Sequence, residues 1–199
     1  MMNAVHISEA VFSNNEEVNF QNNKKILFLI NLAGIISFVL FYCFFFYITN
    51  IFIANKPDNI LFYFKTFRMM SIEFGFMLLA LLVFITIVHE LVHGIFFYLY
   101  TGDKPVFGYK KLAAYAGAPN WFIRKKYYQV ISLSPFILLT ILNFVVLYFV
   151  SGPFTTILFI AASAHAAGCV GDIWISLKLL NKSVDTYIND TGMVLRICN

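Results

Sequence analysis

Apolar residues gather in long runs along this chain, and short polar or charged segments separate them. The first run, residues 26–55, contains no charged side chain and directly follows Lys24 and Lys25. About 20 consecutive apolar residues cross a bilayer as a helix, so this run predicts a first transmembrane helix. A polar turn at residues 56–59 leads to a second helical run at residues 69–100, which is longer than a bilayer requires.

The segment at residues 105–124 has a different pattern. Short stretches of aromatic or small residues lie on either side of Lys110 and Lys111. Such stretches favour two short strands that form a β-hairpin, with Gly117 and Pro119 as residues suited to turns, and a solvated connecting loop is the alternative.

The chain then has no charged side chain from residue 127 to residue 171, a distance too long for one membrane helix. The Ser-Gly-Pro sequence at residues 151–153 favours a break. The pattern therefore predicts a third helix at about residues 130–150 and a fourth at about residues 154–180. The predicted fold class is an all-α membrane protein with about four transmembrane helices and a short β-hairpin after the second.

Composition supports a membrane protein, because 60% of the 199 residues are hydrophobic and only 12% are charged. Soluble domains have about 25% charged residues. We expect one transmembrane domain at residues 26–180, a polar N-terminal segment at residues 1–25 and a polar C-terminal tail at residues 181–199. The three cysteines show no paired spacing that would predict disulfides or a cysteine-based zinc site.

Basic residues lie beside the apolar runs, where membrane lipid explains them, and no basic block predicts nucleic-acid binding. If the N-terminus is cytosolic, eleven of the 14 lysines and arginines fall on the cytosolic side. Membrane proteins retain basic loops in the cytosol, so we predict that both termini are cytosolic.

The second apolar run contains the sequence His89-Glu90-Leu91-Val92-His93-Gly94, an H-E-x-x-H motif. Residues four apart share one face of a helix, so His89 and His93 can bind one Zn²⁺ together. Glu90 lies close enough to take a proton from a zinc-bound water. Two packed histidines without a metal are the alternative, but three ionisable groups on one turn would then be costly in hydrocarbon.

A catalytic zinc usually has three protein ligands, so a third donor is expected. No glutamate follows Glu90 in the sequence, and Asp172 is the only acidic residue of the fourth apolar run. A carboxylate within a membrane needs a partner for its charge. Small residues around it would let two helices approach closely. We therefore predict Asp172 as the third zinc ligand, whereas an Asp that caps a helix or pairs with a lysine is the alternative.

His165 is seven residues before Asp172 and lies about 10 Å from it along a helix. That distance is awkward for ligation of the same ion. We predict instead that His165 and Asn143 line the cleft as polar residues, or that His165 forms a hydrogen bond with Asn143 or a serine.

The chain resembles a bacterial membrane family known as "putative zincin peptidases", which is similar to the site-2 protease class of intramembrane zinc metalloproteases. The resemblance covers residues 69–180 and rests on four sequences. They are the H-E-x-x-H motif, Lys-Pro-Val-Phe-Gly-Tyr after it, Ser134-Pro135, and Gly171-Asp172. It implies His89, His93 and Asp172 as zinc ligands and Glu90 as catalytic base. It also implies a bacterial cell membrane as the location, and a hairpin beside the active site. The Leu-Asp-Gly signature of site-2 proteases is absent, because the aspartate here follows Gly171.

The function expected from the sequence is zinc-dependent peptide-bond hydrolysis at or within the membrane, with one zinc per chain. The substrate would be a peptide or a membrane protein. A non-enzymatic membrane protein that binds a metal, as an accessory or transport component, is the alternative. A glutamate between the histidines has no role in simple metal storage, and this favours the enzyme.

Overall fold

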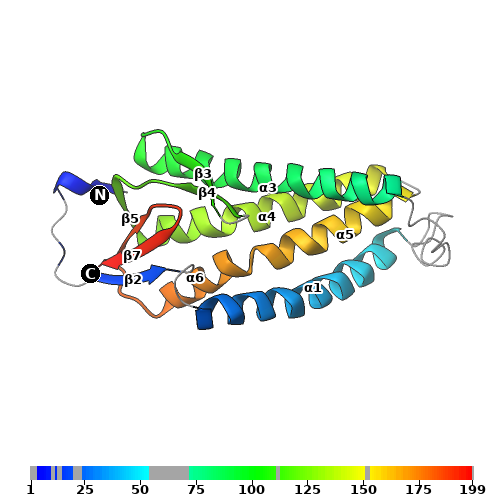
Figure 1. Ribbon diagram of the computed structural model, residues 1–199, viewed down its shortest axis with the longest axis horizontal. Helices are drawn as coiled ribbons and strands as arrows, with labels where there is room; N and C mark the ends of the chain where they lie inside the picture. The colour runs from blue at the N-terminus through cyan, green and yellow to red at the C-terminus, as the bar shows by residue number, and fades with distance from the viewer. Residues whose placement is uncertain are drawn as a thin grey trace. The chain divides into compact units, whose positions relative to one another are not determined.

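The computed structural model describes residues 4–9, 12, 15–19, 24–53, 72–110, 113–150 and 153–198 (Figure 1). The predicted turn at residues 56–59, the first residues of the second run and residues 151–152 of the predicted break lie outside these ranges. Within them, four helical spans are long and apolar enough to cross a membrane, as predicted. They are Leu27–Ile48, Ile72–Thr101, Lys125–Phe149 and Phe154–Leu180.

The fourth span consists of two helices rather than one. Helix α5 ends at Gly168, Cys169 adopts a turn, and helix α6 begins at Val170. Gly168 and Gly171 flank the break, and glycine is a poor helix former because it loses more backbone freedom than other residues. The helices are α1 (Lys24–Ile53), α3 (Ile72–Thr101), α4 (Lys125–Phe149), α5 (Pro153–Gly168) and α6 (Val170–Leu180).

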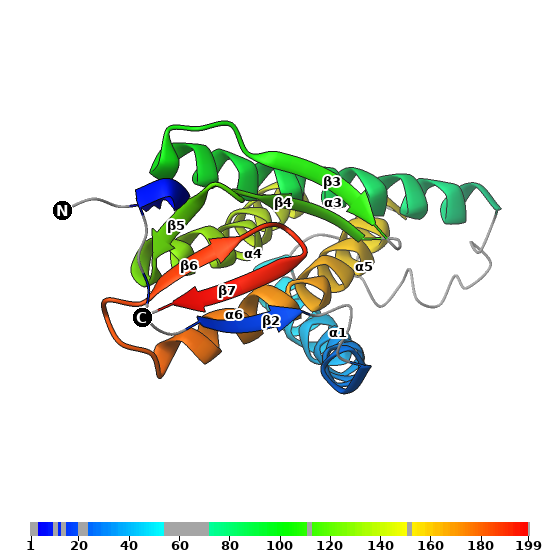
Figure 2. The same cartoon turned by 60° about the vertical axis from the view of Figure 1, so that its left-hand side comes forward.

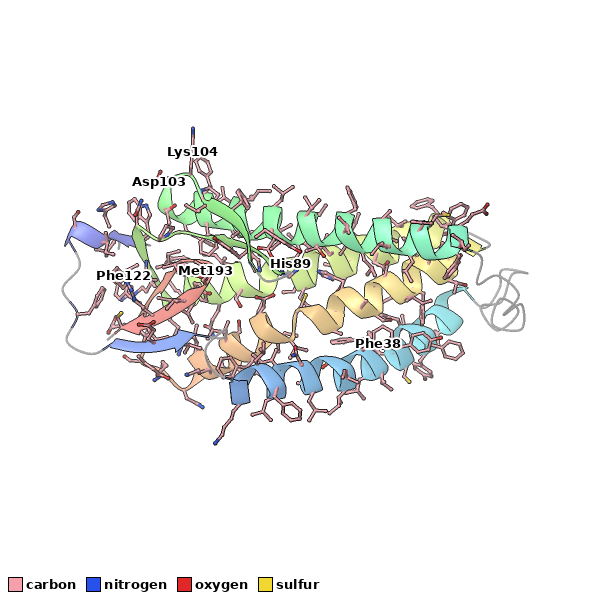
Figure 3. The ribbon with its side chains drawn as sticks, viewed as in Figure 1. Phe38, His89, Asp103, Lys104, Phe122 and Met193 are labelled. Carbon is pink, nitrogen blue, oxygen red and sulfur yellow. The ribbon has the colours of Figure 1, made fainter. Side chains whose placement is uncertain are left out.

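The predicted hairpin is confirmed, with β3 (Val106–Lys110) antiparallel to β4 (Ala113–Gly117). It follows α3, which ends at Thr101 with Gly102 in a left-handed conformation (φ 71°). Such a residue commonly terminates a helix, and glycine adopts this conformation without a Cβ clash. Lys104, in the connection, projects away from the ribbon (Figure 3).

A five-stranded antiparallel sheet was not predicted from the sequence. It joins both polar ends of the chain to the segment before α4, in the order β1-β5-β6-β7-β2 (Figure 2). In β7 the buried Leu195 and Ile197 alternate with the exposed Arg196, as expected for a strand with one face in a core. The strands are β1 (Ala4–His6), β2 (Asn15–Asn19), β5 (Trp121–Arg124), β6 (Tyr187–Asp190) and β7 (Val194–Cys198), and a 3-10 helix, η1 (Ile7–Glu9), follows β1.

The chain divides into two compact units. The first contains residues 1–30, 87–135 and 171–199, as far as they are described, and includes both sheets. The second contains residues 31–86 and 136–170. Helices α1, α3 and α4 each contribute to both units, whereas α6 from Gly171 onward belongs to the first and α5 to the second.

The core of the first unit packs the five-stranded sheet against helices. Ile123, Ile188 and Leu179 are fully buried there. Glu16 on β2 forms ion pairs with Lys178 and Lys182, which connect the N-terminal strand to the end of α6. Hydrogen bonds from these two ammonium groups lower the pKa of Glu16 below its usual value.

The second unit is packed mainly by phenylalanines. Phe45 of α1 and Phe159 of α5 are each 1% exposed, and both lie in one cluster with Ala162 and Ala166. The same two helices lie side by side in both ribbon views. Gly34 lies close to the backbone there, since a Cβ on it would be 3.8 Å from the Ala167 carbonyl oxygen. Small residues of α5 therefore allow α1 to approach it closely.

Candidate metal centre

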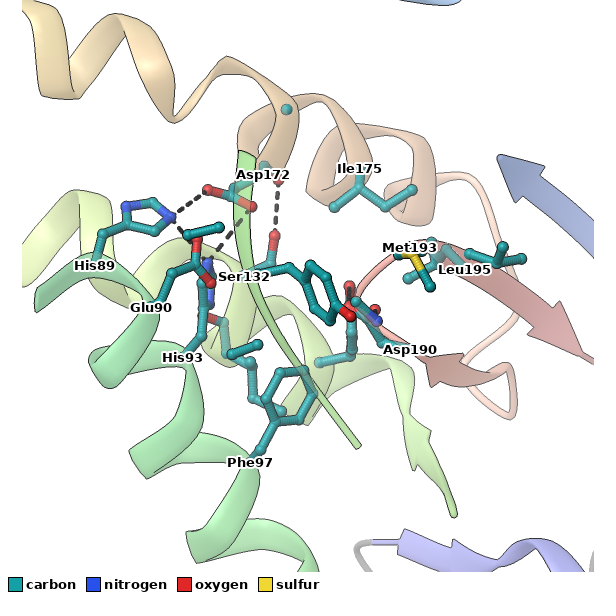
Figure 4. Close-up of a pocket in the computed structure, with 18 of the residues that line it drawn as sticks. His89, Glu90, His93, Phe97, Ser132, Asp172, Ile175, Asp190, Met193 and Leu195 are labelled. Carbon is teal, nitrogen blue, oxygen red and sulfur yellow. Dashed lines mark hydrogen bonds and ion pairs between the residues drawn. The ribbon is translucent and has the colours of Figure 1, made fainter. Parts of the chain in front are cut away.

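Helix α3 presents the two histidines of the motif on one face. His89 and His93 are four residues apart within the continuous helix, and their rings meet edge to face with centroids 4.8 Å apart. Their Nε2 atoms are 3.1 Å apart. Figure 4 shows both rings directed toward Asp172. The local helical repeat is sufficient to produce this pair.

Asp172 reaches the histidines from another helix. It lies in the first turn of α6, directly after the break between α5 and α6. Its Oδ2 is 3.4 Å from Nε2 of His89, and its Oδ1 is 3.6 Å from Nε2 of His93. A carboxylate is favoured in the first turn of a helix by the helix dipole. Because the helix breaks at Cys169, a new helix N-terminus forms there. Asp172 lies in the first turn of this new helix, where it contacts the histidines of α3.

These three donors suit a zinc ion. Zinc in proteins is commonly tetrahedral with bonds of about 2.0–2.1 Å to nitrogen and oxygen, which requires donor atoms about 3.3 Å apart. The three distances here, 3.1, 3.4 and 3.6 Å, bracket that value. Two imidazoles and one carboxylate also leave a fourth tetrahedral position open, as in catalytic zinc sites.

Hydrogen bonds with residues of α4 hold His93 and Asp172 in place. Nδ1 of His93 donates a hydrogen bond to the Ile131 carbonyl oxygen at 3.0 Å. The Ser132 hydroxyl donates to the Asp172 backbone carbonyl at 2.8 Å and accepts from the Ser176 hydroxyl at 3.2 Å. The contact of Nδ1 orients the His93 ring and sets which nitrogen carries the proton, and the Ser132 contact holds the backbone of α6 at Asp172. Helix α4, which carries Ile131 and Ser132, thus supports ligands on both α3 and α6.

Glu90 lines a cavity of about 280 Å³ together with the three donors. Ala116 on β4 lines the same cavity. The hairpin can approach α3 closely because residue 94 is glycine: a Cβ there would lie 2.3 Å from the Phe107 ring. Gly94, the residue after the motif, therefore lets the hairpin form one wall beside Glu90.

The C-terminal hairpin forms another wall of the cavity. Asp190, Gly192 and Met193 line it, although the sequence predicted a polar tail at residues 181–199. Asp190 accepts hydrogen bonds from the Tyr128 hydroxyl and the Gly192 amide, and burial raises the pKa of its carboxyl. Asp190-Thr191-Gly192 is typical of a turn, and strand-like runs of apolar and polar residues lie on both sides of it. This pattern in the sequence indicates a β-hairpin.

The remaining predicted site residues lie in the second unit. His165 is on α5, where its Nε2 is 3.6 Å from Sγ of Cys169. Asn143 is on α4, and its side-chain amide nitrogen is buried without a hydrogen-bond partner in the described part of the chain. Every residue that lines the cavity belongs to the first unit. That His165 and Asn143 line the cleft therefore stays a prediction.

An H-E-x-x-H helix with a carboxylate from a second helix is a donor set that zinc-dependent peptidases use. Residues 82–187, more than half of the chain, match the family described as "Putative zincin peptidase". The chain belongs to this family, as its sequence predicted, and the family name indicates a zinc metallopeptidase. No curated protein and no solved structure matches the chain.

Proposed function

We propose that this protein is a membrane-embedded zinc metalloprotease that hydrolyses peptide bonds at or within the bilayer. One observation carries the proposal: Nε2 of His89, Nε2 of His93 and the Asp172 carboxylate form a triangle with sides of 3.1–3.6 Å beside Glu90 in one cavity. The length and apolar composition of the four spans support a membrane setting. The distribution of basic residues supports a topology with both termini in the cytosol.

The proposed chemistry divides between the metal and Glu90. Zinc held by the three donors would lower the pKa of a water molecule and polarise the scissile carbonyl. Glu90 takes the proton that the attacking water releases and delivers it to the leaving amine.

The edge of β4 supports an extended peptide as substrate. Ala114, Tyr115 and Ala116 line the cavity, and the Ala118 amide, directly after β4, donates to the Asp190 carbonyl oxygen, away from β3. In an antiparallel strand every second amide points to the same edge, so the Ala116 and Ala114 amides also face away from β3. An extended peptide could therefore add to this edge through main-chain hydrogen bonds, with its scissile bond near Glu90.

Ala114→Pro is expected to lower kcat/KM by about tenfold, mainly through a higher KM. Proline removes the amide that faces the cavity, and a hydrogen bond of about 1–1.5 kcal/mol corresponds to roughly that factor. Kinetics on a peptide substrate, with zinc content measured in parallel, would test this. Ala114→Gly retains the amide and is the matched control. Equal KM values in parent, proline and glycine variants would contradict substrate binding at this edge.

The purified protein is expected to contain about one zinc per chain. Elemental analysis after purification in detergent measures this directly, and His93→Ala is the comparison, because it removes one donor. A chelator should remove both the zinc and the peptidase activity, and added zinc should restore them. Near-zero zinc in both parent and variant, or full activity after chelation, would contradict the proposed function.

A further inference from the structure

Helix α4 carries a proline in its interior, at residue 135. In an α-helix the amide of each residue donates to the carbonyl four residues earlier, so the amide of residue 135 would bond to the Ile131 carbonyl. Proline has no amide hydrogen and cannot make this bond. The Ile131 carbonyl is thereby left without its helical donor. Ile131 is only 1% exposed, so water has little access to satisfy that carbonyl.

Two side chains donate to this carbonyl instead. Nδ1 of His93 lies 3.0 Å from the Ile131 oxygen, and Oγ of Ser134 lies 2.8 Å from it. A carbonyl oxygen only accepts hydrogen bonds, so Nδ1 of His93 must carry the proton. In the neutral ring Nε2 then has the free lone pair, and this is the atom that faces His89 and Asp172.

We propose that Pro135 is a positioning residue for His93. By removing an amide from α4, it provides the Ile131 carbonyl as an acceptor that fixes the tautomer and the ring orientation of His93. The inference rests on the proposed zinc site, since it concerns how one of the three ligands is held. An interior proline destabilises a helix, and the gain in ligand orientation offsets that cost.

Pro135→Ala tests the inference, because alanine restores the amide that competes for the Ile131 carbonyl. The zinc dissociation constant is expected to rise 10- to 100-fold, as for loss of other groups that orient a metal ligand. The melting temperature of the metal-free variant should equal or exceed that of the parent, because alanine favours the helix. A metal affinity that falls while stability holds separates positioning from misfolding. Both quantities can be measured on detergent-purified protein by metal competition and thermal unfolding.

A rescue variant and a matched control sharpen the test. An oxygen with two lone pairs cannot fully serve three donors, so adding Ser134→Ala to Pro135→Ala should recover part of the zinc affinity. A purely structural role for Pro135 predicts no such recovery. Pro153→Ala is the control, because the first residue of α5 has no intrahelical acceptor for its amide. It should leave zinc affinity unchanged.

A metal-free readout completes the design. Nitrogen-15 spectra of the histidine rings, assigned by single substitutions and recorded at a pH at which the rings are neutral, should show His93 as the Nδ1-protonated tautomer in the parent. In Pro135→Ala they should show a mixture of tautomers. If the variant keeps the parental zinc affinity and the parental tautomer, Pro135 does not position His93, although the zinc site itself stands. If the parent binds no zinc, the proposed function and this inference both fail.

Discussion

Glu90→Gln is expected to reduce peptide cleavage by about 10²- to 10⁴-fold while zinc content stays near one per chain. Glutamine preserves the size of the side chain and can still meet neighbouring donors through its amide oxygen. It cannot accept the proton that the attacking water releases. Because Glu90 is not among the three zinc donors, the metal should remain bound. Cleavage rate and zinc content measured on the same preparation test this.

Glu73→Gln is the matched control for that experiment. Glu73 is an exposed glutamate in the first turn of the same helix, so the substitution makes the same chemical change outside the cavity. It should leave cleavage unchanged. Parental activity in Glu90→Gln would show that another group is the base. If neither parent nor variant cleaves any peptide while both bind zinc, the protein is instead a non-enzymatic metal-binding protein.

Asp172→Ala is expected to weaken zinc binding by more than about 100-fold. The substitution removes a predicted ligand, so the loss should exceed the 10- to 100-fold typical of groups that only orient a ligand. It also leaves His89 and His93 without the anionic partner that lies 3.4–3.6 Å from their Nε2 atoms. Competition with a zinc chelator of known affinity measures the change. Secondary structure should be retained, because alanine favours a helix.

His165→Ala and Asp185→Ala are the controls for this prediction. Asp185 is an exposed aspartate that pairs with Arg124, so its removal controls for loss of one negative charge elsewhere in the first unit. Both variants should bind zinc as the parent does. If His165→Ala lost zinc and Asp172→Ala retained it, the third ligand would be His165, and the proposed donor set would be wrong.

The helices and the histidine pair could be predicted from the sequence because their causes are local. A run of apolar residues long enough to span a bilayer predicts a helix whatever lies beside it. The spacing of His89 and His93 places both rings on one face through the helical repeat alone. The hairpin at residues 106–117 likewise follows from neighbouring residues. Asp172 was found less directly, since a lone acid in an apolar run indicates a need for a partner but does not identify one.

The five-stranded sheet could not be predicted in the same way. Its strands have three to five residues each and come from both ends of the chain and the middle. Segments this short have weak intrinsic preferences, and pairing with distant partners decides their structure. The position of Asp190 in the cavity wall follows from this pairing, because β6 is held between β5 and β7.

By itself, then, the sequence determined four helical spans of membrane length and a helical turn that presents two histidines and a glutamate. These features depend on hydrophobicity and on the 3.6-residue repeat, which act over a few residues. Only the tertiary structure decided that α6 begins where Asp172 meets the two histidines and that the C-terminal hairpin lines the cavity. It also decided that His93 uses the carbonyl which Pro135 leaves free. Those arrangements join residues from 38 to about 100 positions apart, and packing in three dimensions alone brings such residues into contact.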